Sequence, residues 1–134
     1  QIAKAIKLSP KPIKTTTDLA DLIIAVKRQR SHKLHPATKV FQALRIAVNS
    51  ELDEISRALP QSLAVLEPGG VIISIAFHEG EDRLVKTAFR HWHKHQDGEI
   101  VTKKPITPSK EEVSKNPRAR SAKLRVFRKQ VNES

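Results

Sequence analysis

The hydrophobic pattern is clearest between residues 38 and 59. Six apolar residues follow one another at steps of 3, 4, 4, 3 and 4: Phe41, Leu44, Val48, Leu52, Ile55 and Leu59. This spacing places all six on one face of a helix, with charged residues on the other faces. Pro60 has no backbone N–H, so we expect this helix to end or kink there and a short helix to follow over 61–66.

A different pattern follows over residues 71–77, where every side chain except Ser74 is apolar and most are β-branched. A run without alternation is typical of a strand buried on both faces, as in a parallel sheet. The Pro68-Gly69-Gly70 turn precedes this strand, and a helix with its own apolar stripe is predicted over 81–94. These segments predict a helix–strand–helix unit.

Shorter elements are predicted toward the two ends of the chain. A helix is expected over 19–28, after several N-cap residues at 15–18. Two strands are expected over 100–106 and 122–128, joined by a polar loop with a helical turn at 110–114, and they should form an antiparallel edge pair. The predicted fold class is α/β: the C-terminal half of an open doubly wound sheet, preceded by helical material.

Charge is unevenly distributed along the chain. Lys and Arg number 25 and Asp and Glu 14, a net charge of +11. Residues 1–50 carry ten basic and two acidic residues, residues 51–102 five and nine, and residues 103–134 ten and three. Two basic ends favour a polyanionic partner such as nucleic acid, although a charge run taken alone is more often a solvated surface.

Some functions are excluded by composition. The chain has no Cys, which excludes disulfides, zinc–thiolate sites and thiol nucleophiles. No apolar run approaches the roughly 18 residues of a transmembrane helix. We expect no membrane partner and a cytoplasmic location.

The loop after strand 71–77 carries the acid–base candidates His78, Glu81 and Asp82. Ligand sites in open α/β sheets form at the C-terminal ends of strands, and such side chains can exchange protons with a substrate. The two carboxylates also suit the first turn of the following helix, and that structural alternative stays open. His91 and His95 share a helix face, but no carboxylate is suitably placed beside them, so we predict no metal site.

Two groups of cationic residues are candidates for phosphate contacts. The first comprises Lys27, Arg28, Arg30 and Lys33. The second comprises Arg118, Arg120, Lys123 and Arg125, and Arg83 on the predicted helix 81–94 is a further single candidate. Pro117 stiffens the loop beside Arg118 and Arg120. The alternative for the second group is an edge strand whose cationic side chains prevent edge-to-edge pairing.

Several short blocks occur in a fixed order along the chain: His35-Pro36-Ala37-Thr38, Phe41-Gln42-Ala43-Leu44-Arg45-Ile46, Val48-Asn49, Glu51-Leu52, Pro68-Gly69-Gly70, Phe77-His78, Glu81-Asp82-Arg83, Val85-Lys86 and the run over 116–125. Together they resemble the S-adenosylmethionine-dependent methyltransferases that modify the N4 amino group of a cytosine in small-subunit ribosomal RNA (the MraW/RsmH type). The first and last blocks are the most specific. The resemblance extends over residues 2–129.

The resemblance implies a class I methyltransferase fold with a helical insertion that helps to recognise RNA. Residues 1–37 would be the remainder of that insertion, residues 38–134 the C-terminal part of the methyltransferase domain, and helix 38–59 the bridge between them. The complete enzyme would use S-adenosylmethionine and small-subunit ribosomal RNA. The alternative is a non-catalytic RNA-binding or ribosome-associated module derived from the family.

The family's Gly-rich cofactor loop is not among these residues, since the chain has four glycines and no Gly-x-Gly. We therefore expect no cofactor-binding residues here, no activity from this chain alone, and either self-association or dependence on a missing N-terminal half. The family usually reads Ser-Phe-His-Ser-Leu-Glu-Asp-Arg where this chain has Ala76-Phe77-His78-Glu79-Gly80-Glu81-Asp82-Arg83. A hydroxyl is lost, a carboxylate gained and a glycine introduced beside the predicted active site.

Overall fold

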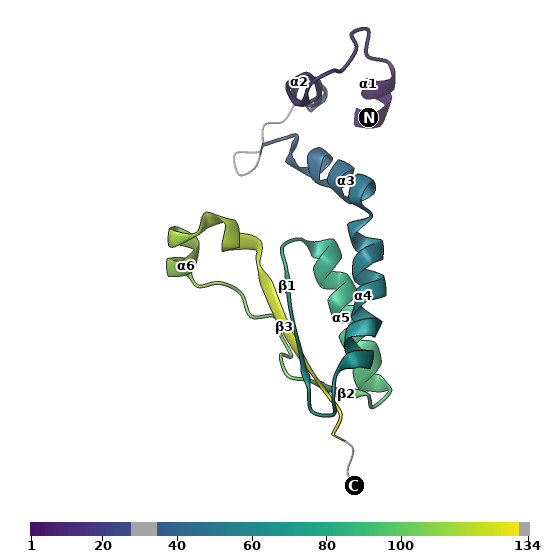
Figure 1. Ribbon diagram of the computed structural model, residues 1–134. Helices are drawn as coiled ribbons and strands as arrows, with labels where there is room; N and C mark the ends of the chain where they lie inside the picture. Colours follow the sequence, from purple (N-terminus) through teal and green to yellow (C-terminus); the bar gives the residue numbers. More distant parts are fainter. Residues whose placement is uncertain (28–34, 132–134) are drawn as a thin grey trace. The chain divides into compact units, whose positions relative to one another are not determined.

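The computed structural model describes residues 1–27 and 35–131 (Figure 1). The elements follow in the order α1 (Ile2–Lys7), α2 (Thr16–Val26), α3 (Thr38–Asn49), α4 (Glu51–Val65), β1 (Val71–Ala76), α5 (Glu79–Lys94), β2 (Gly98–Ile100), α6 (Lys110–Lys115), the 3-10 helix η1 (Pro117–Ser121) and β3 (Lys123–Lys129). They divide into two compact units, Gln1–Asn49 and Ser50–Ser134.

The first unit is helical. A capping box starts α2: the Thr15 hydroxyl accepts a hydrogen bond from the Asp18 N–H at 3.1 Å, and the Asp18 carboxylate accepts one from the Thr15 N–H at 2.8 Å. Ile23 in α2 and Ala37 before α3 are buried. The helix predicted over 19–28 is therefore present, beginning three residues earlier and ending at Val26.

The single helix predicted over 38–59 is wrong, because α3 and α4 are separated at Ser50. Ser50 has a φ of 52° and a ψ of 32°, in the left-handed region that interrupts a right-handed helix. The Ser50 carbonyl then accepts hydrogen bonds from the N–H groups of Asp53 and Glu54, which start α4. The apolar stripe is thereby divided between the two units.

Pro60 does not end α4, which continues to Val65. The separate helix predicted over 61–66 is therefore also wrong. Leu59 and Leu63, on either side of Pro60, both pack against the core. That shared contact stabilises one continuous helix across the proline.

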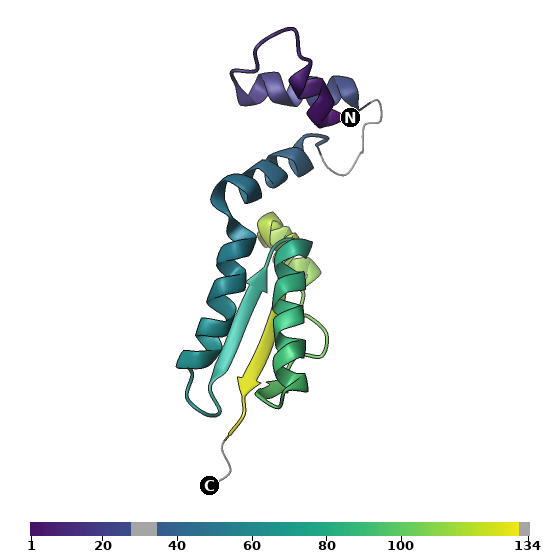
Figure 2. The same cartoon turned by 90° about the vertical axis from the view of Figure 1, so that its right-hand side faces the viewer.

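Within the described residues, the sheet has three strands in the order β1–β3–β2, and both pairings are antiparallel. Helices α4 and α5 lie against one of its faces (Figures 1 and 2). Along β1, Ala76 is buried, but the opposite face leaves Ile73 64% and Ile75 55% exposed. The prediction of a strand buried on both faces in a parallel sheet is therefore wrong for the described residues, because helices cover only one face and β3 runs antiparallel.

The second predicted strand, 100–106, is reduced to β2 and an isolated bridge between Ile106 and Leu124. Its predicted antiparallel pairing with the last strand is confirmed. Gly98 permits this pairing, because a Cβ there would lie 2.1 Å from the Arg128 carbonyl oxygen.

Aromatic rings form the centre of the core. Phe89 and Trp92 of α5 pack against Phe127 of β3, with ring centroids 5.3 Å apart in both pairs. The other residues of this cluster are Val85, Ala88, Leu59, Leu63, Ile72 and Ile100. Among residues 1–27 and 35–131, no helix combines the length and apolarity needed to cross a membrane.

Candidate functional site

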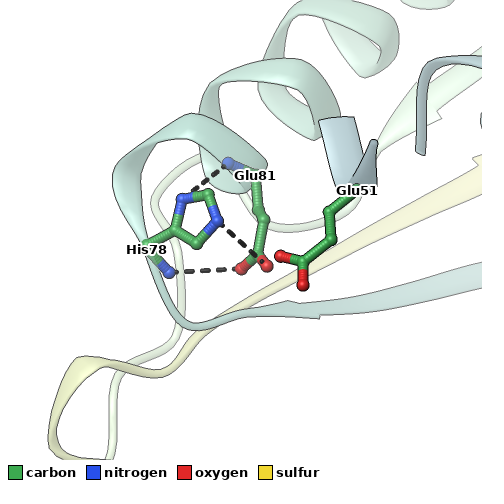
Figure 3. A group of neighbouring side chains, drawn as sticks. All are labelled: Glu51, His78 and Glu81. Atoms are coloured by element: carbon green, nitrogen blue, oxygen red, sulfur yellow. Dashed lines mark hydrogen bonds and ion pairs between the residues drawn. The ribbon is translucent and has the colours of Figure 1, made fainter. Parts of the chain in front are cut away.

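His78 is the N-cap of α5 and lies two residues beyond the last residue of β1. Its imidazole Nδ1 accepts hydrogen bonds from the N–H groups of Gly80 at 3.1 Å and Glu81 at 3.3 Å. The Glu81 carboxylate reaches back and accepts a hydrogen bond from the N–H of Phe77 at 2.8 Å. It also accepts one from the N–H of His78 at 3.2 Å (Figure 3). These reciprocal bonds are a capping box with histidine as the N-cap.

This network assigns the histidine tautomer. Because Nδ1 accepts two N–H bonds, the proton of the neutral imidazole is on Nε2. The His78 side chain is 10% exposed, and Nε2 lies 3.2 Å from Oε1 of Glu81 without a well-directed hydrogen bond to any described residue. The capping box thus holds a buried N–H donor beside a carboxylate.

Glu51 joins this pair from the first turn of α4. Its carboxylate faces the other two side chains, and the ligand atoms of Glu51, His78 and Glu81 all lie within 4.8 Å of one another (Figure 3). Sequence periodicity placed Glu51 only among the charged residues away from the apolar face. Its presence in the Glu51-Leu52 block of the family resemblance was the available signal.

Two carboxylates and an imidazole could in principle ligate a divalent cation. Ligation through Nε2 needs a free lone pair there, and a metal-bound histidine ordinarily donates its other ring N–H. Here Nδ1 of His78 faces two backbone donors, so the proton occupies the nitrogen that points toward Glu81. The arrangement favours hydrogen-bond exchange with a polar ligand over metal binding.

Asp82 occupies a separate, buried position. Its carboxylate accepts hydrogen bonds from Nε of Arg125 at 2.7 Å, Nη2 of Arg125 at 3.2 Å and Nζ of Lys123 at 3.4 Å. The Arg125 hydrogen bond lowers the pKa of Asp82 below its ordinary value of 3.8. Asp82 therefore links α5 to β3. Both carboxylates lie in the first turn of α5, as the structural alternative expects, but Asp82 also makes a contact with β3 that the sequence did not predict.

These contacts change the set of phosphate candidates on β3. Arg125 is 8% exposed and bonded to Asp82, so its charge is already paired within the fold. Lys123 is half-buried and shares the same carboxylate. Arg83 of α5 is exposed and pairs with Glu79 at 3.4 Å.

The remaining cationic candidates lie elsewhere. Arg118 and Arg120 are exposed on η1, where the Asn116 side chain caps the Arg118 N–H at 3.3 Å. Lys27 donates to the Pro36 carbonyl at 3.3 Å within the first unit. Arg28, Arg30 and Lys33 lie outside the described residues.

Comparison with known proteins decides the family. Residues 1–130 match the model of the MraW methylase family. The chain belongs to this family. Proteins named ribosomal RNA small subunit methyltransferase H are similar to it over most of its length. The one from Coprothermobacter proteolyticus is 49% identical over 98% of this chain and 44% of that relative.

Two other MraW-family relatives match this chain with similar identity and coverage. The protein of that name from Persephonella marina is 49% identical over 89% of this chain and 41% of its own length, and the one from Caldicellulosiruptor bescii is 47% identical over 96% and 48%. The chain thus spans less than half the length of these relatives. The resemblance read from the motif blocks is confirmed, and a small antiparallel sheet with helices is consistent with part of an α/β methyltransferase.

Proposed function

We propose that this chain is part of an enzyme that transfers a methyl group from S-adenosylmethionine to the N4 amino group of a cytosine in small-subunit ribosomal RNA. The observation that carries the proposal is family membership over residues 1–130, together with relatives named as ribosomal RNA small subunit methyltransferases. In such an enzyme, this chain contributes the C-terminal part of a class I sheet and the remainder of a helical insertion.

We infer that the residues of this chain do not hold the cofactor. Gly69 lies in the turn before β1, where its N–H bonds to the Lys129 carbonyl, and the Gly70 N–H bonds to the Glu67 carbonyl. Gly80 lies in α5 and Gly98 pairs with β3, so no glycine-rich loop remains to approach a nucleotide. We assign the cofactor site to the part of the enzyme outside this chain.

This chain's contribution then lies on the substrate side. The group formed by Glu51, His78 and Glu81 lies at the C-terminal end of β1, where open α/β sheets bind ligands. An exocyclic amino group is a donor of two hydrogen bonds, and carboxylates are acceptors that can also take its proton. We assign Glu51 and Glu81 to orient the amino group, and the buried Nε2–H of His78 to position the Glu81 carboxylate, whose Oε1 lies 3.2 Å away.

The test is methyl transfer by the full-length protein that contains this chain. It would be incubated with isotopically labelled S-adenosylmethionine and an unmodified transcript of small-subunit ribosomal RNA. Digestion to nucleosides and mass spectrometry should reveal label in N4-methylcytidine. Label in another nucleoside, or label in N4-methylcytidine that persists when the protein is omitted, would contradict the proposal.

One observation favours a second candidate, a non-catalytic RNA-binding or ribosome-associated module. The Glu81 carboxylate and Nδ1 of His78 are engaged in the capping box, and Gly80 stands where the family usually has leucine. On this alternative, the full-length protein binds the transcript and incorporates no methyl group. The same experiment, with RNA binding measured in parallel, separates the two functions.

A further inference from the structure

A cationic pocket of about 210 Å³ lies between α5 and the loop that follows β2. Five of its lining residues carry positive charge and none is acidic: Lys86, Arg90, Lys103, Lys104 and Arg125. We propose that this pocket binds a phosphate of the substrate RNA backbone. The proposal rests on the proposed function and adds to it a backbone-anchoring site that the motif blocks do not indicate.

Four of these cations lack partners within the described part of the chain. Lys86, Arg90, Lys103 and Lys104 make no hydrogen bond or ion pair with a described residue. Some exposed cations of the same unit are paired locally: Arg57 with Glu54, Arg83 with Glu79, Lys115 with Glu111 and Arg128 with Glu99. Four other exposed cations also lack a partner among the described residues, but they do not line the pocket: Lys94, Lys110, Arg118 and Arg120. The pocket therefore concentrates positive charge that has no counter-charge in these residues.

This concentration is unfavourable without an anion. Lys86 and Arg90 are four residues apart on α5, where like charges repel and destabilise a helix. The loop brings two more cations, Lys103 and Lys104, into the same concave surface. A bound phosphodiester would turn this repulsion into attraction, which is the physical argument for an external anion.

The pocket is also held in place by the sheet. Val126 donates its N–H to the Thr102 hydroxyl at 2.9 Å, and Ile106 and Leu124 exchange backbone hydrogen bonds at 2.8 and 2.9 Å. These bonds fix the loop on both sides of Lys103 and Lys104. Arg125 is fixed by Asp82. The backbone of the site is thus ordered before binding, which reduces the entropy lost when an anion binds.

The lining residues indicate that the pocket recognises backbone and not bases. Phe89 is its one aromatic residue and is 1% exposed, so no ring face is available for stacking on a base. Lys and Arg bind phosphate without reading sequence. A free phosphate ion shares this chemistry, and the experiment must distinguish it from RNA.

The test compares two double variants of the full-length protein, each of which loses two positive charges. Arg90→Gln with Lys104→Gln removes two pocket cations. Lys94→Gln with Lys110→Gln is the matched control, because both residues are exposed and neither lines the pocket; Lys94 also lies one turn beyond Arg90 on α5. Binding to the small-subunit ribosomal RNA transcript and to an oligouridine strand is measured over a range of salt concentrations.

The pocket variant should lower the slope of log affinity against log salt by about 0.7 to 0.9, because the pocket holds one phosphate and each lost phosphate contact contributes about that much. The same decrease is expected with oligouridine, and the control variant should keep the slope of the unmodified protein. Equal decreases in both variants, or none in the pocket variant, would overturn the proposal. So would binding of inorganic phosphate that depends on these residues while the RNA slope stays unchanged.

The experiment distinguishes a failure of the phosphate site from a failure of the proposed activity. If the pocket variant keeps its slope while the unmodified protein forms N4-methylcytidine, only the phosphate site fails. If the slope falls but no methyl group is transferred, the phosphate site stands and the enzymatic function fails.

Discussion

The Arg125 guanidinium in β3 donates two hydrogen bonds to the Asp82 carboxylate in α5, at 2.7 Å from Nε and 3.2 Å from Nη2. Both residues are buried, with exposed fractions of 8% and 6%. The pair therefore joins the sheet to the first turn of α5, the turn that holds His78 and Glu81. The position of the candidate site depends on this buried pair.

The first prediction concerns the stability that this pair provides. Asp82→Leu leaves the buried Arg125 without its carboxylate and should lower the free energy of unfolding by about 3 to 5 kcal/mol. Adding Arg125→Met should restore much of that loss, because the unpaired charge is then removed. Glu99→Gln is the control, since it breaks the exposed pair with Arg128 and should cost at most about 1 kcal/mol. Urea unfolding measures the free energy of unfolding of all three variants. Equal decreases for Asp82→Leu and Glu99→Gln would contradict the role of the buried pair.

The second prediction concerns pH. The Arg125 hydrogen bond lowers the pKa of Asp82 below 3.8, so the folded state binds this proton less readily than the unfolded state. Such a carboxyl contributes stability above its unfolded pKa and loses that contribution as the pH falls from about 4 through the lowered value. The stability difference between the unmodified protein and Asp82→Asn should therefore narrow over that acidic range.

Asp18 also makes the stability of the protein depend on pH in the acidic range. Its pKa is also lowered, chiefly by the hydrogen bond from the Thr15 N–H. Because both proteins retain Asp18, its effect cancels in the difference between them. If the free energies of unfolding of the unmodified protein and of Asp82→Asn differ by the same amount from about pH 6 to about pH 2, Asp82 does not contribute to stability in this way.

The third prediction separates capping from chemistry at His78. Asn is among the best N-cap residues, so His78→Asn should keep α5 intact while it removes the Nε2–H donor. Methyl transfer by the full-length protein should fall about 10- to 100-fold, because the Glu81 carboxylate loses the N–H that positions it, a loss of about 1 to 3 kcal/mol. Glu81→Gln should likewise preserve the cap through its amide oxygen but lose the carboxylate.

Helicity and unfolding midpoint are the controls for these two variants. A variant that folds normally and transfers methyl groups at the unmodified rate would leave that residue as a helix cap alone. A loss of activity that is matched by a loss of stability would also contradict a role in the reaction. The expected result is a loss of activity with an unchanged unfolding midpoint.

The elements that sequence patterns predicted well are those with local signals. The apolar stripe of residues 81–94, the antiparallel pairing of the last two strands and the helical turn near 110 all follow from short-range spacing, and the structure contains them. His78 and Glu81 also have the three-residue spacing of a capping box, which could have predicted their reciprocal bonds.

The errors arose where distant contacts override local preference. Nothing in the sequence around Ser50 requires a left-handed residue, and Pro60 alone favours a helix end that packing of Leu59 and Leu63 prevents. The burial of β1 depends on which faces helices cover, and Asp82 meets a residue 43 positions later. Neither periodicity nor residue type carries this information.

The fourth prediction concerns RNA binding at η1. Arg118 and Arg120 are exposed there, on a short helix whose start is fixed by Pro117 and the Asn116 cap. Replacing both with Gln should lower the salt slope of binding to small-subunit ribosomal RNA by about 1.4 to 1.8. The Lys94→Gln and Lys110→Gln double variant again controls for net charge. A slope equal to that of the unmodified protein would remove η1 from the RNA interface.

The last prediction concerns the 134-residue chain in isolation. β1 pairs with β3 along one edge, and its outer face exposes Ile73 and Ile75, which together form an apolar surface beside an open strand edge. Such a strand favours association with a second copy. We therefore expect the isolated chain to self-associate in sedimentation velocity, and Ile73→Lys to reduce that association because the charge lies on the exposed face.

We also expect the isolated chain to show no tight binding of S-adenosylmethionine in calorimetry, because its four glycines form no cofactor loop. Micromolar binding at one site per chain, or methyl incorporation into small-subunit ribosomal RNA by the chain alone, would sink the assignment of the cofactor site to the rest of the enzyme.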